Sequence, residues 1–288
     1  MQLSPVQFEV QTPCVDDVPK HIEHAMSLGL PEADGEPLRR LTIIANGPSA
    51  KDAPLDGDTL ALNGALKLFF NTGRVPTYWA ACDPQRDYVL SFLDVPLSKE
   101  TIYLVGSKCH PDVFKRLEGF DVRIWHINDY PIPEPGRPVK TASTVTLTAM
   151  TLMRRLGYRH FDLWGWDGCY GMDDSHHAVP HDVEFSRESD LTVNVGAQQK
   201  GYRRKLKLAD YRKWRAMKKL GKQLGLEVPL PQETRTEGGR EFKSTRSWAL
   251  EAQDAVHVLH LADYTVKIYG DGMIKAILAQ TGLNIEPG

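Results

Sequence analysis

Short apolar segments separated by helix-compatible stretches constrain the fold of this chain more than any other feature. Seven runs of four or five residues are rich in aliphatic and aromatic side chains, and polar or glycine-containing turns bound them. Uninterrupted apolar runs of this length are typical of strands buried on both faces, as in a parallel sheet. The predicted strands are Leu41–Ala45, Thr59–Leu62, Tyr78–Cys82, Thr101–Val105, Val122–His126, Phe161–Trp164 and Thr265–Tyr269.

Helical patterns lie between several of these runs. Strands that alternate with helices predict an α/β fold, here a Rossmann-like, mostly parallel sheet with helices on both faces. Prolines at 131, 133, 135 and 138 predict a stiff linker, because proline excludes a helix there. The predicted helices are His21–Leu28, Ala65–Phe70, Pro111–Leu117, Ser143–Leu156 and a last one that follows Gly272 and ends near Gln280.

The same pattern divides the chain into three parts. Residues 1–40 form an N-terminal extension, and residues 41–228 form the Rossmann-like domain. Within it, residues 166–199 are polar and without periodicity, which predicts a long, lid-like loop. Residues 229–288 then supply a polar loop (229–247), a strand and a helix that complete the same domain.

Charge is distributed unevenly. Residues 200–222 hold eleven Lys or Arg and one acid, a local charge of +10 in a chain of net charge −2, so the remainder carries −12. Trp214, Met217 and Leu220 recur at helical spacing, which predicts a basic amphipathic helix over 202–225. Such a patch attracts phosphates, acidic glycans, nucleic acid or anionic lipid heads. A solvated helix face without a partner is the alternative.

Several classes of protein are disfavoured by composition. The four cysteines are scattered and form no CxxC pair, which argues against a disulfide framework or a structural zinc site. No apolar run approaches the ~20 residues of a membrane-spanning helix. The first residues lack the basic and apolar regions of a secretory signal. We therefore expect a cytoplasmic protein, with residues 200–222 offering peripheral contact to a membrane surface.

Polar turns follow the predicted strands, where ligands bind in an open parallel sheet. Asn46, Gly47, Pro48 and Ser49 follow the first strand. Glycine allows close approach of the backbone, proline stiffens the turn, and serine caps a following helix whose N–H groups favour phosphate. The motif is neither a P-loop nor a GxGxxG fingerprint, and an ordinary strand–helix turn is the alternative.

Three further strand ends carry polar residues. Asn63 and Gly64 follow the second strand, Asp83 the third, and Gly165 and Asp167 the sixth. A carboxylate in this position is suited to a metal-bound phosphate or a sugar hydroxyl, although aspartate is also a common helix cap. Polar groups at four strand ends of one sheet together favour a ligand site.

The predicted loop contains a histidine cluster. His176, His177 and His181 lie near Asp173 and Asp174. A histidine here would abstract a proton near neutral pH. The same cluster would also bind a divalent metal, although its spacing is not that of a standard zinc motif. A polar surface loop is the alternative.

Five segments taken together resemble a known family. The segments resemble the MptE-like (6-hydroxymethylpterin diphosphokinase-like) domain family, which includes the motility-associated-factor glycosyltransferases. They are also similar to the pattern of bacterial lipooligosaccharide sialyltransferases. The resemblance covers residues 41–170. Its segments are IIANGPSA at 43–50, LALNGA at 60–65, VPTYWAACD at 75–83, STVTLTAM at 143–150 and LGYRHFDLWGWD at 156–167.

The resemblance implies a Rossmann-like fold that binds a nucleotide donor. By match with the sialyltransferases, Asn46, Ser49 and Asn63 would face the nucleotide, and Ser143 with Thr144 would correspond to a second serine motif. This sequence departs from the sialyltransferases at Asp83, where they have asparagine, and it has no histidine in the downstream stretch where they place theirs. The aspartate fits the diphosphokinases, which hold metal-bound phosphates.

We therefore expect a glycosyltransferase that moves a sugar from a nucleotide-sugar to a hydroxyl acceptor without a cofactor. Asp83 and Asp167 would order the sugar or phosphates, and a loop histidine would be the base. One alternative is a diphosphokinase that moves diphosphate from ATP to a hydroxymethylpterin-like acceptor, with Mg²⁺ on both aspartates. Another is a non-catalytic protein that binds nucleic acid or an anionic surface. Three basic residues would neutralise the departing phosphate or steer an anionic acceptor, namely Arg203, Arg204 and Lys205.

Overall fold

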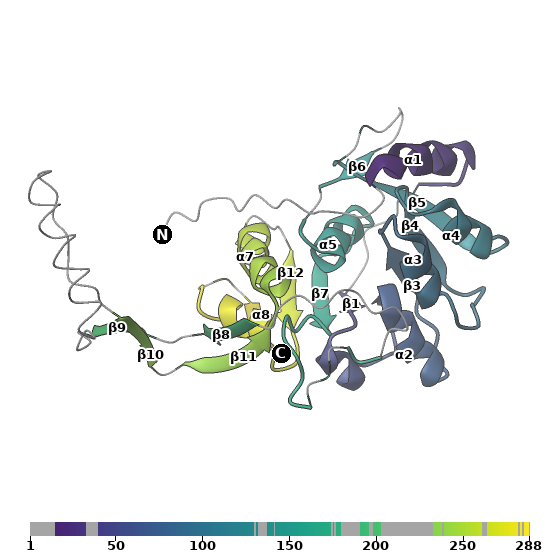
Figure 1. The fold of residues 1–288 in the computed structure, drawn as a ribbon. Coiled ribbons are helices and arrows are strands. Elements are labelled where there is room, and N and C mark those ends of the chain that lie inside the picture. Colours follow the sequence, from purple (N-terminus) through teal and green to yellow (C-terminus); the bar gives the residue numbers. More distant parts are fainter. Residues whose placement is uncertain are drawn as a thin grey trace, which may run out of the picture. The chain divides into compact units, whose positions relative to one another are not determined.

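A computed structural model shows a nine-stranded sheet flanked by helices (Figure 1). The strand order is β13-β12-β7-β1-β2-β3-β4-β5-β6, and every neighbouring pair is parallel. The fold is therefore a mostly parallel, Rossmann-like α/β architecture. The structure describes residues 15–32, 40–129, 131, 137–140, 142–173, 175, 177–179, 191–195, 198–202, 233–237, 239–260, 264–281, 283 and 285–287.

The direction in which the chain adds strands to the sheet reverses at β1. From β1 the chain adds strands on one side as far as β6, and it then returns to place β7, β12 and β13 on the other side. Within the ladder, Ile44 of β1 lies beside Ala61 of β2 and Trp164 of β7. The strands are β1 (Arg40–Ile44), β2 (Thr59–Leu62), β3 (Tyr78–Ala81), β4 (Ile102–Gly106), β5 (Asp121–Ile127), β6 (Pro138–Val139), β7 (His160–Trp164), β12 (Thr265–Ile268) and β13 (Ile285–Pro287).

Helices cover both faces. The right-handed crossover rule for parallel strands puts α2, α3 and α4 on one face and α5, α7 and α8 on the other, because the chain adds strands in opposite directions from β1. Contacts between α3 and α4 and between α7 and α8 agree with this division, and Figure 1 shows α5 and α7 next to each other. The helices are α1 (Val18–Ser27), α2 (Leu66–Asn71), α3 (Arg86–Phe92), α4 (Pro111–Arg116), α5 (Val145–Arg155), α7 (Arg246–His260) and α8 (Met273–Leu278), with 3₁₀ turns η1 (Val15–Asp17), η2 (Pro48–Asp52) and η3 (Asn63–Ala65).

All seven predicted strands are confirmed, with ends that differ by at most one residue. Their apolar runs are buried as expected; in β2 and β3 every residue is buried. The predicted helices are also present, as α1, α2, α4, α5 and α8. Within the described residues, two helices were not predicted, α3 and α7.

Four short strands correct the prediction of irregular loops. β8 (Leu191–Val195) lies in the loop predicted over 166–199, and β10 (Glu233–Glu237) and β11 (Arg240–Ser244) lie in the loop predicted over 229–247. These strands pair with segments far away in sequence, β8 with β11 and β9 (Gln198–Tyr202) with β10. Local periodicity does not report long-range pairing of polar strands.

Two further predictions need adjustment. Tyr202, the expected first residue of the basic helix, is the last residue of β9. The proline-rich linker contains β6, which pairs with β5 through His126 and Pro138. The remainder of the predicted basic helix, residues 203–225, lies outside the described residues.

The chain separates into two compact units. One comprises residues 1–193 and 242–288, and the other comprises residues 194–241. The first unit contains the whole nine-stranded sheet. The second contains the antiparallel β9–β10 pair, in which Tyr202 lies beside Glu233.

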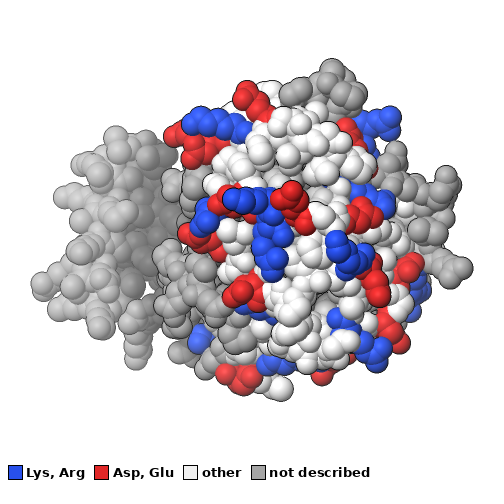
Figure 2. Space-filling model, turned by 90° about the vertical axis from the view of Figure 1, so that its right-hand side faces the viewer, with Lys and Arg blue, Asp and Glu red and all other residues white. Residues whose placement is uncertain are grey.

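The described surface carries charges of both signs. Figure 2 shows Lys and Arg interspersed with Asp and Glu over one face of the molecule. Ion pairs such as Arg86–Asp112, 2.5 Å, and Arg123–Asp121, 3.2 Å, join neighbours of opposite charge. None of the helices in the described part of the chain is long and apolar enough to cross a membrane.

Truncation within the central strand tests this core. Ile43 of β1 is fully buried between β2 and β7. We expect Ile43→Ala to lower the free energy of unfolding by about 2–5 kcal/mol, because it removes apolar contacts and leaves a cavity. Val75→Ala, at a side chain that is 43% exposed, should change it by less than about 0.5 kcal/mol. Urea denaturation measures both; equal effects would contradict the assigned core.

Candidate ligand-binding site

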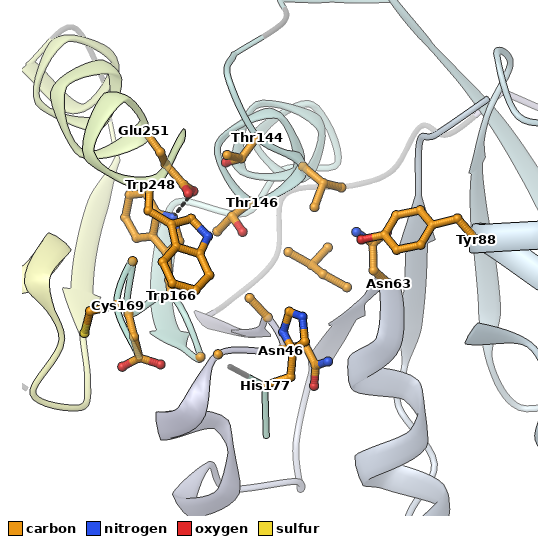
Figure 3. Close-up of a pocket in the computed structure, with 17 residues that line it drawn as sticks. Asn46, Asn63, Tyr88, Thr144, Thr146, Trp166, Cys169, His177, Trp248 and Glu251 are labelled. Carbon is orange, nitrogen blue, oxygen red and sulfur yellow. Dashed lines mark hydrogen bonds between the residues drawn. The ribbon is translucent and has the colours of Figure 1, made fainter. Parts of the chain in front are cut away.

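A pocket of about 240 Å³ opens beside β1, where the order of the strands in the sheet reverses. Ala45, Asn46 and Gly47 line it after β1, Asn63 lines it after β2, and residues 165–169 line it after β7. Parallel sheets bind ligands at such a switch point, because loops from neighbouring strands diverge there and leave a crevice. The helices contribute Tyr88 from α3, Thr144, Val145 and Thr146 at the start of α5, and Trp248 and Glu251 from α7 (Figure 3).

The turns after β1 and β7 are bonded to each other. The Ala45 N–H donates to Trp164 O at 2.8 Å, and the Gly47 N–H donates to Gly165 O at 2.8 Å. Gly165 has φ +69°, and a Cβ there would lie 2.4 Å from Ala45 O. Only glycine fits this close, left-handed turn. The parallel ladder is thereby extended into the floor of the pocket.

Ser49 and Asp167 complete this junction. The Ser49 backbone N–H and hydroxyl both donate to Asp167 Oδ2, at 2.9 and 3.0 Å, and the Gly165 N–H donates to Ser49 Oγ at 2.9 Å. The Ile274 N–H also donates to Asp167 O, which joins the start of α8 to the same turn. Burial raises the pKa of Asp167, and the two bonds from Ser49 oppose that rise. Asp167 lines the pocket, whereas the Ser49 hydroxyl is engaged beneath it.

Asn46 holds the loop that carries His177. Its Nδ2 donates to Val179 O at 3.0 Å, and its Oδ1 accepts from the Val179 N–H at 3.2 Å. The Ala178 N–H donates to Asn46 O at 2.8 Å. Figure 3 shows the His177 ring next to Asn46 at the edge of the pocket. Asn46 therefore positions a predicted base, in addition to lining the pocket itself.

Asn63 lines the pocket and carries a buried acceptor that has no partner among the described residues. It has φ +48°, a left-handed conformation that asparagine tolerates better than most residues. The Trp79 Nε1–H donates to Asn63 O at 2.9 Å and holds this backbone in place. Asn63 Oδ1 is buried and has no hydrogen-bond partner among the described residues. A buried unpaired acceptor is costly, so its presence here indicates a place for a ligand donor.

The start of α5 faces the same space. Thr144 is its N-cap, with Oγ1 accepting from the Leu147 N–H at 3.4 Å. The Ser143 N–H donates to Asp254 Oδ2 at 2.8 Å, so α7 supplies a carboxylate to this helix start. Ser143 Oγ is buried without a partner among the described residues, and it does not line the pocket.

Helix α7 builds a wall that the sequence did not reveal. The Trp166 Nε1–H donates to Glu251 Oε1 at 2.5 Å. Burial raises the pKa of Glu251 from 4.5 to about 7; the bonds from Trp166 and Thr144 oppose the rise, and Asp254 adds to it. Trp248 stands beside them (Figure 3). The pocket therefore contains a buried carboxyl group that titrates near neutrality.

The other predicted site residues lie elsewhere. Pro48 and Gly64 support the turns without lining the pocket. Asp83 is also absent from the lining; its Oδ1 accepts from the Gln85 N–H at 2.8 Å, and burial raises its pKa. In the described part of the chain, no three His, Cys, Asp or Glu side chains form a group suited to a metal ion. The remaining predicted residues fall outside the described residues, namely Asp174, His176, His181, Arg203, Arg204 and Lys205.

The sequence did carry one signal for the wall. Trp248, Ala252 and Ala255 recur at three- and four-residue spacing, which indicates an amphipathic helix. Glu251 falls on that apolar face, and an acid there is unusual unless it is paired or functional. Its proximity to Trp166 and Thr144 depends on how α7 packs, which no local pattern reports.

The structure defines a Rossmann-like α/β protein with a pocket at the switch point of its sheet. No protein-family model matches the sequence, and no curated protein is similar to it. Among solved structures, the chain is similar to a MAf glycosyltransferase from Magnetospirillum magneticum AMB-1, with a TM-score of 0.52 and 11% identity. The match covers 88% of this chain and 37% of that chain, so this protein spans little more than a third of its structural neighbour. The likeness establishes a shared fold.

Loss of the Ser49 hydroxyl tests the junction beneath the pocket. Ser49→Ala leaves the Gly165 N–H without its acceptor and removes one donor from Asp167. We expect the free energy of unfolding to fall by about 1–3 kcal/mol, because buried polar groups are left unpaired. Ser27→Ala removes a hydroxyl that donates to His24 O on the exposed surface and should have little effect. Urea denaturation of the two variants compares them; similar losses would contradict this role.

The raised pKa of Glu251 predicts a pH-dependent stability. The carboxyl is neutral in both folded and unfolded chains below about pH 4.5, and between pH 4.5 and 7 only the unfolded chain ionises. The folded state therefore loses on the order of 3 kcal/mol as the pH rises through this window. Glu251→Gln should lack this loss and gain stability relative to wild type from pH 5 to pH 8. Urea denaturation at both values measures it; a constant difference would refute the assignment.

Proposed function

We propose that this protein is a nucleotide-donor transferase, and specifically a glycosyltransferase that moves a sugar from a nucleotide-sugar to a hydroxyl acceptor. The observation that carries the proposal is the pocket itself. It combines a switch-point turn, a helix start, an unpaired amide acceptor and two titratable side chains, Glu251 and His177. The shared fold with a MAf glycosyltransferase supports it.

The parts of the pocket suit the parts of such a donor. The helix start at Thr144–Thr146 lines the pocket, and the N–H groups and partial positive charge of a helix start favour a phosphate. The Asn63 amide oxygen would accept a hydrogen bond from a hydroxyl or amino group of the nucleotide. Asn46 and Gly47 would complete the nucleotide subsite along the first turn. Arg203, Arg204 and Lys205 remain predicted phosphate or acceptor ligands.

Transfer also needs a proton acceptor for the attacking hydroxyl. Two titratable side chains that line the pocket are candidates for this role, namely His177, the member of the predicted histidine cluster that the structure describes, and Glu251 of α7. This mechanism requires no metal and no cofactor.

A diphosphokinase is the second candidate, on one observation. Asp167 lines the pocket, and a carboxylate there is a suitable ligand for Mg²⁺ bound to ATP phosphates. Asp83, the other predicted Mg²⁺ ligand, does not line it, which weakens this alternative.

A thermal-shift panel separates the two functions. CMP-sugars, UDP-sugars, ATP and GTP would each be added with and without Mg²⁺. We expect a nucleotide-sugar to raise the Tm without metal, because a ligand that binds only the folded state stabilises it. Stabilisation by ATP with Mg²⁺ alone would replace the glycosyltransferase with the diphosphokinase. Stabilisation by neither would overturn both.

Asn63 provides a residue-level test of the nucleotide subsite. Asn63→Gly removes the amide while glycine retains the positive φ. We expect about five- to tenfold weaker binding of the stabilising nucleotide-sugar, because one hydrogen bond is lost. Asn71→Gly, at an exposed residue ending α2, is the matched control. Isothermal titration calorimetry measures both; unchanged affinity in the Asn63 variant would remove it from the subsite.

A further inference from the structure

The α7 side of the pocket has the composition of an acceptor subsite. Trp248 and Glu251 lie one turn apart on α7, and Trp166 joins them from the turn after β7. Figure 3 shows this group on one side of the pocket and Asn63 with Tyr88 on the opposite side. Tryptophan faces pack against sugar rings and other flat apolar surfaces, whereas carboxylates accept hydrogen bonds from hydroxyl groups. The α7 side therefore suits the acceptor, and the side with Asn63 and Tyr88 suits the nucleotide donor.

We propose that Glu251, and not a histidine, is the residue that takes the proton from the acceptor hydroxyl, in a subsite walled by Trp166 and Trp248. This inference rests on the glycosyltransferase function proposed above. The hydroxyl proton passes to the Glu251 carboxylate as the acceptor oxygen bonds to the anomeric carbon of the donor. The bond from that carbon to the phosphate oxygen breaks, and the nucleotide leaves with the electron pair. Glu251 then releases the proton to solvent.

The geometry favours this carboxyl because its position is fixed. It is 6% exposed, and the Trp166 indole N–H donates to its Oε1 at 2.5 Å from a different element of the fold. Each carboxylate oxygen keeps a further lone pair for the acceptor hydroxyl. A general base acts best when it is oriented before the substrate arrives.

The groups around Glu251 also determine the pH range in which its carboxyl group is ionised. Asp254 on the same helix disfavours the ionised form, whereas the bonds from Trp166 and Thr144 favour it. Asp167 and Cys169 after β7 and His177 from the following loop are the other ionisable groups that line this pocket with Glu251 and Tyr88. Burial raises the pKa of the Tyr88 hydroxyl to about 12, so that group stays neutral. A base with a pKa near 7 is suited to proton abstraction at neutral pH.

A fluorescence titration tests the ionisation without requiring turnover. The indole of Trp166 bonds to the Glu251 carboxyl, so ionisation of that carboxyl should change the indole emission. We expect the wild-type protein to show a transition near pH 7 that Glu251→Gln lacks. The same transition in the variant would overturn the assignment of the titrating group.

Kinetics then test the role. The rate of nucleotide release from the stabilising nucleotide-sugar, with water as the acceptor, would be followed from pH 5 to pH 9. We expect Glu251→Gln to lower kcat by at least about 100-fold at pH 7.5, as for loss of a general base. The donor-induced rise in Tm should persist in this variant, because the nucleotide side is untouched.

In a plot of kcat against pH, the acid limb is the range in which kcat falls as the pH falls. Two substitutions next to Glu251 should move this limb in opposite directions. Trp166→Phe removes a hydrogen bond to the charged carboxylate, so the limb should shift up by about one pH unit. Asp254→Asn removes a negative neighbour, so the limb should shift to lower pH. A merely structural role for Glu251 would not produce opposite shifts. His177→Gln should leave the position of the limb unchanged.

The outcomes separate this proposal from the function on which it rests. Donor binding without loss of rate in Glu251→Gln, or an acid limb that moves with His177→Gln, would overturn the role of Glu251 and leave the glycosyltransferase in place. A wild-type protein that binds no nucleotide-sugar would overturn both.

Discussion

The pocket depends on the junction between the turns after β1 and β7. Ser49 joins the two turns, since its hydroxyl donates to Asp167 and accepts from the Gly165 N–H. Asp167 in turn receives the Ser49 N–H through its side chain and the Ile274 N–H through its carbonyl. The loops that follow β1, β7 and β12 are thereby held together. They would otherwise diverge, because the order of the strands reverses at β1. Residues expected to contact ligand thus also support the site.

A second junction joins α5 to α7 above the pocket. The Ser143 N–H before α5 donates to the Asp254 carboxyl of α7, and the neighbouring Thr144 opposes the rise in the pKa of Glu251. Carboxylates stabilise a helix start through its partial positive charge. Burial opposes ionisation of Glu251 in the same place. The packing of α5 against α7 therefore stabilises the start of α5 and also raises the pKa of Glu251 to about 7.

Much of the fold followed from local patterns. The seven apolar runs predicted seven strands of the central sheet, because burial on both faces requires nearly every residue to be apolar. The strand-end turns placed Asn46, Gly47, Asn63 and Asp167 at one edge of the sheet. The paired strands β8 to β11 were missed because their partners are distant in sequence and β9 to β11 are polar. In β8 the apolar residues Leu191, Val193 and Val195 do alternate with polar ones, and the loop prediction overlooked this strand pattern.

The sequence by itself determined the α/β class, the strand ends that form the floor of the pocket, and the loop that carries His177. Only the tertiary structure decided which of these groups contact ligand space. It directed the Ser49 hydroxyl to Asp167, left Asp83 off the lining, and brought Glu251 to Trp166. The reason is physical: turn chemistry and burial are local properties of a chain, whereas hydrogen-bond partners depend on helix packing across the sheet.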